Sequence, residues 1–292
     1  MKEEFNTIAG RRLWQKAGFR HFLLVSPAIV ALLLLFAYPI SRILVKSLFD
    51  PGFTLKHYLY FFSSPLYIRV MWITIELSVL TTFTALVIGY ILAYVLRRAR
   101  PGIRNVFLLA IVLSFMISLL VRNYSWILVL QRNGVINIVL KYFGIIDQPV
   151  KLLHNKLGVV VGMTHIFVPY IAFPIYSVMM GMDLNLEKAA QNLGASRWQT
   201  FWRVTFPLSL PGIGAGALLV FIMALGFFIT PALLGGRKEQ MLSNLIQIQV
   251  VDLLNWPFAS AMSTILLIVT LFIFFIYNRF LGAERLWGGV KT

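Results

Sequence analysis

Six long apolar runs constrain this chain more than any other feature of its sequence. They occupy residues 22–41, 70–96, 105–121, 157–180, 212–234 and 258–278. A helix needs about 20 apolar residues to cross a hydrocarbon layer roughly 30 Å thick, and only helices and closed barrels satisfy their backbone hydrogen bonds there. The runs are continuous, whereas barrel strands alternate between apolar and polar residues. The sequence therefore predicts an all-α, polytopic membrane protein with six transmembrane helices.

The composition excludes the main soluble classes. Of the 292 residues, 59% are hydrophobic and 12% are charged, against about 25% charged in a soluble domain. The net charge of +16 would suggest nucleic-acid binding in a soluble chain. Here the basic residues flank the apolar runs, so we interpret them as signals of membrane orientation and expect no nucleic-acid partner. The absence of cysteine excludes a disulfide framework, a thiolate metal site and a cysteine nucleophile.

The distribution of basic residues predicts the orientation. Residues 1–21, 97–104, 181–211 and 279–292 are alternate connections, and they hold 15 of the 26 Lys and Arg. Basic residues are retained on the cytoplasmic side of a membrane, so both termini are predicted to be cytoplasmic. The chain then divides into a cytoplasmic N-terminal segment, a six-helix transmembrane domain (22–278) that contains the cytoplasmic loop 181–211, and a cytoplasmic C-terminal tail.

The loop 181–211 has a helical pattern. Its apolar residues are spaced i, i+3, i+4 and i+7 and form one stripe, which consists of Leu186, Ala189, Ala190 and Leu193. Glu187 and Lys188 lie elsewhere on this helix. Asp183 or Asn185 can cap its start.

A sharp turn and a second helix are predicted to follow. Gly194 stands where a left-handed residue ends a helix, and Ser196 with Gln199 forms a capping box that begins the next one. We expect this second helix to end at Phe206, and Pro207 to begin the turn into the fifth span.

The residues alone leave two interpretations of this element. The stripe could pack an interfacial helix on the chain's own spans. Alternatively, it could dock a cytoplasmic partner, whose surface could come close to the backbone over Ala189, Ala190 and Gly194.

The loop resembles the EAA signature of ABC importer permeases, in which Glu-Ala-Ala is followed by three residues, Gly, nine residues and Ile-x-Leu-Pro. Ala189 and Ala190 are followed here at the same spacing by Gly194 and by a segment that ends in Pro207. Two departures are present: Lys188 stands where the Glu is usually found, and Val and Phe replace Ile and Leu before Pro207. An ionic contact made from position 188 would therefore have the opposite sign.

Other segments resemble the spermidine/putrescine branch of these permeases, in particular its B-type subunit. The likeness covers about residues 25–285 and includes the segments 120–126, 144–149, 168–174, 207–213, 230–236 and 256–261. It implies a transmembrane domain like that of type I ABC importers, located in a bacterial inner membrane. It also implies that the transporter imports polyamines by alternating access. It also implies that contact with the ATPase is made through Leu186, Glu187, Lys188, Ala189, Ala190, Leu193, Gly194, Ser196 and Pro207.

The resemblance further implies a set of partners. This chain has no Gly-x-x-x-x-Gly-Lys-Ser/Thr loop to hold ATP, so it is not expected to be an enzyme or to bind a cofactor itself. ATP and Mg are expected on two partner ATP-binding cassette subunits. A second, related permease, an extracytoplasmic substrate-binding protein and membrane lipid complete the expected surroundings. The small residues Gly212, Gly214, Gly216 and Ala217 are a candidate interface with the second permease.

Candidate residues for the translocation pathway come from charge and aromatic chemistry. Glu76 is the one carboxylate within the six apolar runs; it could bind a substrate ammonium, or it could pair with a neighbouring helix or stay wet near the interface. Aromatic faces attract organic cations, so the candidates are Tyr124, Trp126, Tyr170, Phe173, Tyr176, Phe227 and Phe228. For each of these residues taken singly, the sequence favours a structural role.

Other functions remain as alternatives at this stage. The same architecture could import an amino acid, a quaternary amine or an aminophosphonate. A channel, a secondary carrier or an intramembrane enzyme are further classes, the last of which would need Ser114 or Ser118 to face His165. The dispersed histidines suggest no metal site.

Overall fold

A computed structural model describes residues 25–281, and this part of the chain is helical, with one isolated β-bridge between Phe49 and Phe53. The helices are η1 (Leu33–Ala37), α2 (Tyr38–Leu48), α3 (Lys56–Ser63), α4 (Pro65–Arg98), α5 (Pro101–Met116), α6 (Leu119–Leu130), α7 (Val135–Tyr142), α8 (Lys156–Met180), α9 (Leu184–Asn192), α10 (Arg197–Thr200), η2 (Phe201–Thr205), α11 (Phe206–Leu225), α12 (Ile229–Leu234), α13 (Leu242–Val251) and α14 (Trp256–Leu281). The predicted all-α class is confirmed. The segment 1–21 and residues 282–292 of the predicted tail lie outside the described residues.

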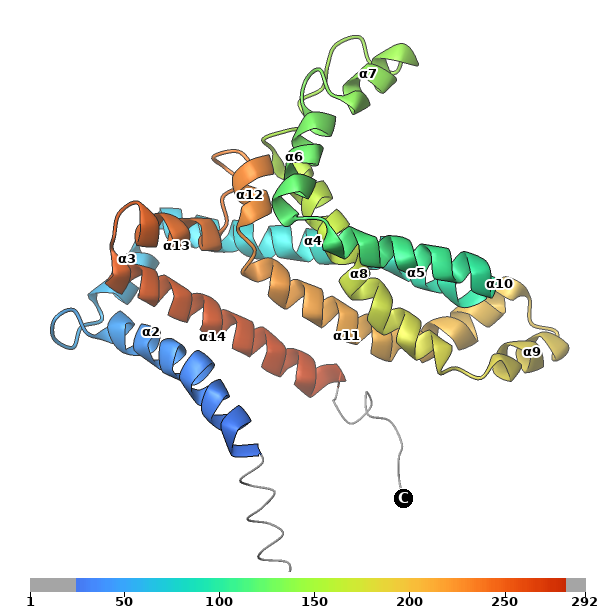
Figure 1. The fold of residues 1–292 in the computed structure, drawn as a ribbon, viewed down its shortest axis with the longest axis horizontal. Coiled ribbons are helices and arrows are strands. Elements are labelled where there is room, and N and C mark those ends of the chain that lie inside the picture. The colour runs from blue at the N-terminus through green and yellow to red at the C-terminus, as the bar shows by residue number, and fades with distance from the viewer. Residues whose placement is uncertain (1–24, 282–292) are drawn as a thin grey trace, which may run out of the picture.

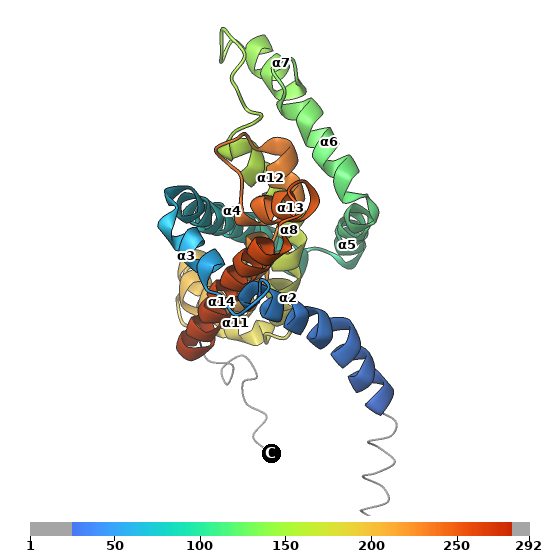
Figure 2. The ribbon, with the colours of Figure 1, turned by 90° about the vertical axis from the view of Figure 1, so that its left-hand side faces the viewer.

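Three long helices, α4, α8 and α11, form the centre of the bundle (Figure 1). Their contacts bury Leu77 and Ala85 of α4 against Met163, Phe167 and Ile171 of α8. Helices α2 and α14 lie side by side along another face, and α2 diverges from the bundle toward its N-terminal end (Figure 2). Helices α3 and α13 gather at one end of the bundle, while α9 and α10 lie at the other.

The contact between α8 and α11 depends on glycine. A Cβ atom added at Gly212 would come within 2.9 Å of the Ile175 Cα, and one at Gly216 within 3.1 Å of the Ile171 Cα. Gly214 instead faces Tyr277 of α14. Gly212 and Gly216 are therefore buried against α8 of their own chain, and the prediction that they form the interface with a second permease is wrong for these two residues.

Within residues 25–281, five helices are long and apolar enough to cross a membrane: Val25–Leu48, Pro65–Arg98, Lys156–Met180, Arg197–Leu225 and Trp256–Arg279. The predicted third span, 105–121, is not one straight helix. Its residues belong to α5 and to a segment that begins with α6, and the two are bent by 99°. Ile117 and Ser118 have extended backbone, with ψ of 130° and 138°, so the helical hydrogen bonds stop there. Hydropathy does not detect this break because apolar residues continue across it.

The predicted fifth span, 212–234, also differs from the structure. The helix begins at Arg197, continues through Pro207 and ends at Leu225, and the short α12 follows after a break. The predicted end at Phe206 is wrong because η2 is a π-helical turn, in which the Phe206 amide donates to the Phe201 carbonyl. The wider turn accommodates Pro207, which has no amide hydrogen to contribute.

Candidate coupling and transport site

The local structure of loop 181–211 follows the sequence closely. The Asp183 side chain caps α9 by accepting a hydrogen bond from the Asn185 amide at 2.8 Å. Gly194 has a φ of 89°, a left-handed conformation that favours glycine and ends the helix. Ser196 and Gln199 form the predicted capping box, with bonds of 3.2 and 2.9 Å. The helix, the turn and the start of the second helix are therefore confirmed.

A buried ionic cluster attaches α9 to the transmembrane helices. The Glu187 carboxylate accepts hydrogen bonds from Arg97 at 2.6 Å, Arg98 at 3.1 Å and the Thr205 hydroxyl at 2.9 Å. The side chains of Arg97 and Glu187 are 3% and 13% exposed. Because these partners come from α4 and η2, the cluster, here called the inner cluster, joins three parts of the chain.

The inner cluster also sets the ionisation of Glu187. Burial by itself raises the pKa of this carboxyl, but the Thr205 hydrogen bond and the charges of Arg97 and Arg98 outweigh it and hold the pKa below the usual glutamate value. The carboxylate is therefore charged at neutral pH. No local pattern in the sequence indicates these partners, which are separated from Glu187 by 90, 89 and 18 residues.

The apolar stripe of α9 points away from the rest of the chain. Leu186 is 47% exposed and Leu193 is 90% exposed, and Ala189 and Lys188 are exposed beside them. Only Ala190 of the stripe is partly buried. The interpretation that the stripe packs α9 on the chain's own spans is therefore wrong, and the residue that faces inward is Glu187.

An aromatic group continues from α9 to the spans. Trp198 and Trp202 are exposed, and Phe201 between them packs edge-on against Tyr90 and Tyr94 of α4. The exposed indoles suit the interfacial position expected of tryptophan.

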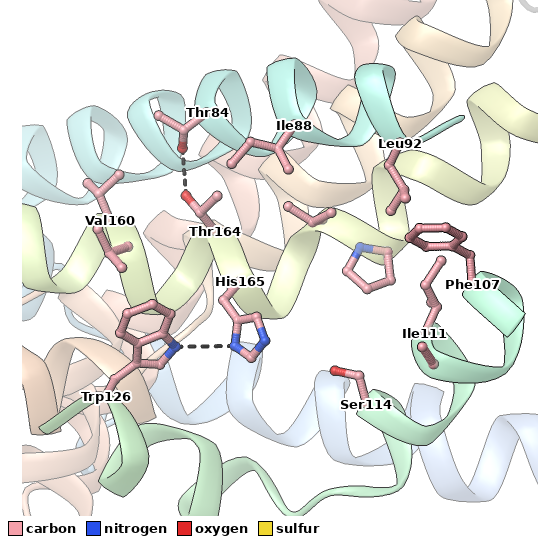
Figure 3. Close-up of a pocket in the computed structure, with 14 residues that line it drawn as sticks. Thr84, Ile88, Leu92, Phe107, Ile111, Ser114, Trp126, Val160, Thr164 and His165 are labelled. Atoms are coloured by element: carbon pink, nitrogen blue, oxygen red, sulfur yellow. Dashed lines mark hydrogen bonds between the residues drawn. The ribbon is translucent and has the colours of Figure 1, made fainter. Parts of the chain in front are cut away.

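A cavity of 590 Å³ lies between α4, α5, α6 and α8 (Figure 3). Its wall is mostly apolar, and its polar groups form two pairs: the Thr84 and Thr164 hydroxyls are 2.6 Å apart, and the Trp126 indole donates to His165 Nδ1 at 3.2 Å. The proton of the neutral imidazole is then on Nε2. Ser114 lines the same cavity, and none of the described lining residues is a carboxylate.

The structure distributes the predicted pathway residues over different environments. Trp126 lines the cavity. Tyr170 and Phe173 pack on Phe115 of α5, and Phe227 packs on Phe167 in the core. Tyr124 and Phe228 are exposed, and Tyr176 packs against the core. Glu76 accepts a hydrogen bond from the Lys156 ammonium of α8, so its carboxylate pairs with a neighbouring helix.

Comparison with known proteins decides the family. The profile described as "Binding-protein-dependent transport system inner membrane component" matches residues 85–284, more than half of the chain. The chain belongs to this family. It is therefore a transmembrane permease subunit of an ABC importer, a multi-pass inner-membrane protein rather than an enzyme, and the ATPase is a separate subunit. The matched residues include the whole of loop 181–211.

Similar proteins point to one branch of the family. The spermidine/putrescine transport system permease protein PotB of Haemophilus influenzae is 35% identical over 234 residues, which cover 79% of this chain and 82% of that protein. PotB of Escherichia coli is 34% identical over 78% of this chain and 82% of its own length. The inner membrane ABC transporter permease protein YdcU of Escherichia coli is 28% identical over 72% of this chain and 70% of its own length.

Solved structures share the fold. A chain of a bacterial ABC transporter that imports the acidic polysaccharide alginate has a TM-score of 0.77 at 21% identity, and the match covers 92% of this chain and 99% of that one. A chain of the MetNI methionine ABC transporter in an inward-facing conformation has a TM-score of 0.52 at 20% identity, over 73% of this chain and 93% of that one. The importer-like transmembrane fold is thus confirmed.

Proposed function

We propose that this subunit forms one half of the translocation pathway of a polyamine importer and receives the movement of a cytoplasmic ATPase through α9. The observation that carries the docking role is the exposed stripe of α9, Leu186, Ala189 and Leu193, on a helix fixed from behind by the inner cluster. Because α9 is fixed to α4 and η2, a partner that binds its apolar surface and moves would also move these transmembrane helices. The identity to spermidine/putrescine permeases supports the substrate class.

The proposed assembly contains two ATP-binding cassette subunits, which bind ATP and Mg, a second related permease and an extracytoplasmic binding protein. A complex of the structurally similar alginate transporter with its periplasmic protein supports the last of these. ATP binding closes the ATPase pair, α9 and the attached α4 and η2 move together, and the pathway opens outward to receive the substrate.

We further propose that both termini are cytoplasmic. The bonds from Arg97 and Arg98 to Glu187 support this orientation, because they bring connections 97–104 and 181–211 to the same end of the bundle. These are two of the connections whose basic residues indicate the cytoplasmic side.

The substrate is tested by uptake of radiolabelled spermidine and putrescine in cells with and without this subunit, with amino acids, choline and aminophosphonates as competitors. We expect polyamine uptake to depend on the subunit and to resist all three groups of competitors. Uptake that is unchanged without the subunit, or dependence of another compound on it, would reject polyamines as the substrate.

The docking role is tested by Leu193→Asp, with Gln191→Asp as its matched control on the opposite side of α9. Both variants add one charge to an exposed position. We expect Leu193→Asp to abolish uptake and co-purification of the ATPase while the subunit still inserts, and Gln191→Asp to retain both. Gln191→Pro should also abolish uptake, because proline breaks the helix. Equal effects of the two aspartates would contradict docking through the stripe.

A further inference from the structure

Glu76 is the one carboxylate on the described helices that could cross a membrane. It lies on α4, about two turns beyond Val70, and its side chain reaches Lys156 at the start of α8. Ionisable groups within spans are costly and are usually retained for a function. The side chain that pairs with Glu76 therefore indicates which class of cation this carboxylate can bind.

Its partner is a primary alkylammonium. The Lys156 Nζ donates to Glu76 Oε1 at 2.5 Å, and no second hydrogen bond to this carboxylate is present among residues 25–281. Both side chains are about half exposed, at 48% and 49%. The rest of this subunit therefore does not enclose the pair, and Glu76 Oε2 accepts no hydrogen bond from residues 25–281.

Lys156 is also a poor stabiliser of its own helix. It is the first residue of α8, after the cap residue Asn155, and a positive charge is unfavourable at the N-terminal end of a helix dipole. Exposed pairs between flexible side chains are weak in general. The ammonium group is therefore held at this position by Glu76 and not by α8.

The pair joins the two helices, α4 and α8, that form one wall of the cavity, at the point where α8 begins. Steps of four residues lead from Glu76 to Thr84 and Ile88 on α4, and from Lys156 to Val160 and Thr164 on α8. All four of these end points line the cavity, and Figure 3 shows them on the neighbouring faces of the two helices. Val160 is one helical turn, roughly 6 Å, from Lys156. The α8 end of the pair is thus one helical turn from a residue of the cavity wall.

We propose that Glu76 is a binding site for the primary ammonium group of the substrate and that Lys156 occupies this site in its absence. The substrate's ammonium displaces Lys156, and Lys156 returns when the substrate has moved on. This inference rests on the proposed import of polyamines and adds the residue that recognises them. A quaternary amine such as choline has no N–H to donate, so it would compete poorly for the carboxylate.

The test uses the complete importer in nanodiscs and measures equilibrium binding of radiolabelled spermidine without the binding protein, together with uptake in cells. Glu76→Gln should weaken binding about tenfold, the loss expected for one charge-assisted hydrogen bond. Lys156→Gln should strengthen binding several-fold, because it removes the competing ammonium. Lys151→Gln, which removes the same charge from a nearby exposed position, should leave binding unchanged.

The double variant Glu76→Gln/Lys156→Gln separates this role from a structural ion pair. For a structural pair, both single variants would lower binding and the double variant would restore it. For the proposed site, the double variant binds as weakly as Glu76→Gln. The gain of affinity in Lys156→Gln cannot arise from misfolding, and a loss of affinity in that variant would overturn the proposal.

Wild-type uptake of spermidine is measured first, since it separates the two proposals. If the wild type takes up spermidine and Glu76→Gln equals it in binding and uptake, the Glu76 site is wrong and the polyamine importer stands. If the wild type takes up no spermidine, the proposed function fails and the Glu76 site fails with it.

Discussion

Helix α4 forms ion pairs with distant parts of the chain toward both of its ends, and the two sites have different surroundings. Near its C-terminal end, Arg97 and Glu187 are 3% and 13% exposed, and Arg98 and Thr205 add further hydrogen bonds to the carboxylate. Near its N-terminal end, Glu76 and Lys156 are about half exposed and share one hydrogen bond.

The difference assigns different tasks to the two pairs. A buried carboxylate with three donors has one favourable position, so the inner cluster fixes α9 relative to α4 and η2. An exposed pair with one hydrogen bond costs little to separate, so the pair of Glu76 and Lys156, here called the outer pair, can exchange partners. The two proposed roles are therefore force transmission at one end of α4 and ligand binding at the other.

Glu187→Gln should have the largest effect. It leaves Arg97 buried without a counter-charge, which costs about 3 kcal/mol of unfolding free energy. Denaturant unfolding of the purified importer measures this loss. Asp183→Asn is the matched control, because it removes an exposed carboxylate from the same element while asparagine still caps α9. Similar losses of unfolding free energy in the two variants would show that the inner cluster stabilises the fold no more than an exposed carboxylate does.

Thr205→Val tests the third donor to Glu187. A hydrogen bond to a charged group contributes about 1.5–3 kcal/mol, so this variant should lose roughly 2 kcal/mol in the same unfolding assay. Thr200→Val removes a buried hydroxyl that donates to the neutral Ser196 carbonyl, and it should lose about 1 kcal/mol. If Thr200→Val were the more damaging, the charge of Glu187 would not be the reason for the effect.

The stability that Glu187 contributes should depend on pH in one direction. Its pKa is lowered in the folded protein, so the contribution is complete above the unfolded value of about 4.3 and is lost as pH falls through the lower folded value. The difference in unfolding free energy between wild type and Glu187→Gln should thus be constant from about pH 5 to 8 and shrink below about pH 4. A difference that fades between pH 5 and 7 would indicate a raised pKa and an unpaired carboxylate.

Lys156→Gln should have the smallest effect on stability. The outer pair is half exposed, and such pairs contribute about 0–1 kcal/mol. The small difference from wild type should disappear in roughly 1 M salt, where the screening length is about 3 Å. A loss as large as that of Glu187→Gln would make the outer pair structural and remove the contrast between the two ends of α4.

Features that depend on neighbouring residues could be predicted from the sequence. The Asp183 cap, the left-handed Gly194 and the Ser196–Gln199 capping box each involve bonds over two or three positions, so a short segment contains all the information. The apolar runs likewise predicted the spans, because hydropathy is a property of composition.

Features that depend on distant residues could not be predicted in this way. The partners of Glu187 and Glu76 are up to 90 residues away, and no local pattern connects them. The spacing of the apolar residues in α9 predicts an apolar face, but it does not predict whether this face points toward the rest of the chain or away from it. The inner cluster determines that orientation. The break at Ile117 and Ser118 and the continuous helix through Pro207 were missed because backbone hydrogen bonding, rather than hydropathy, decides both.

The most direct test of the docking role uses the absence of cysteine from this chain. A single cysteine at Leu193 or, as the control, at Gln191 carries a photoreactive thiol reagent, and the importer is irradiated in its native membrane. We predict that Leu193→Cys cross-links to a subunit whose sequence contains the Gly-x-x-x-x-Gly-Lys-Ser/Thr loop, and that Gln191→Cys does so far less. Equal cross-linking from both positions, or none to such a subunit from Leu193→Cys, would contradict docking of the ATPase on the α9 stripe.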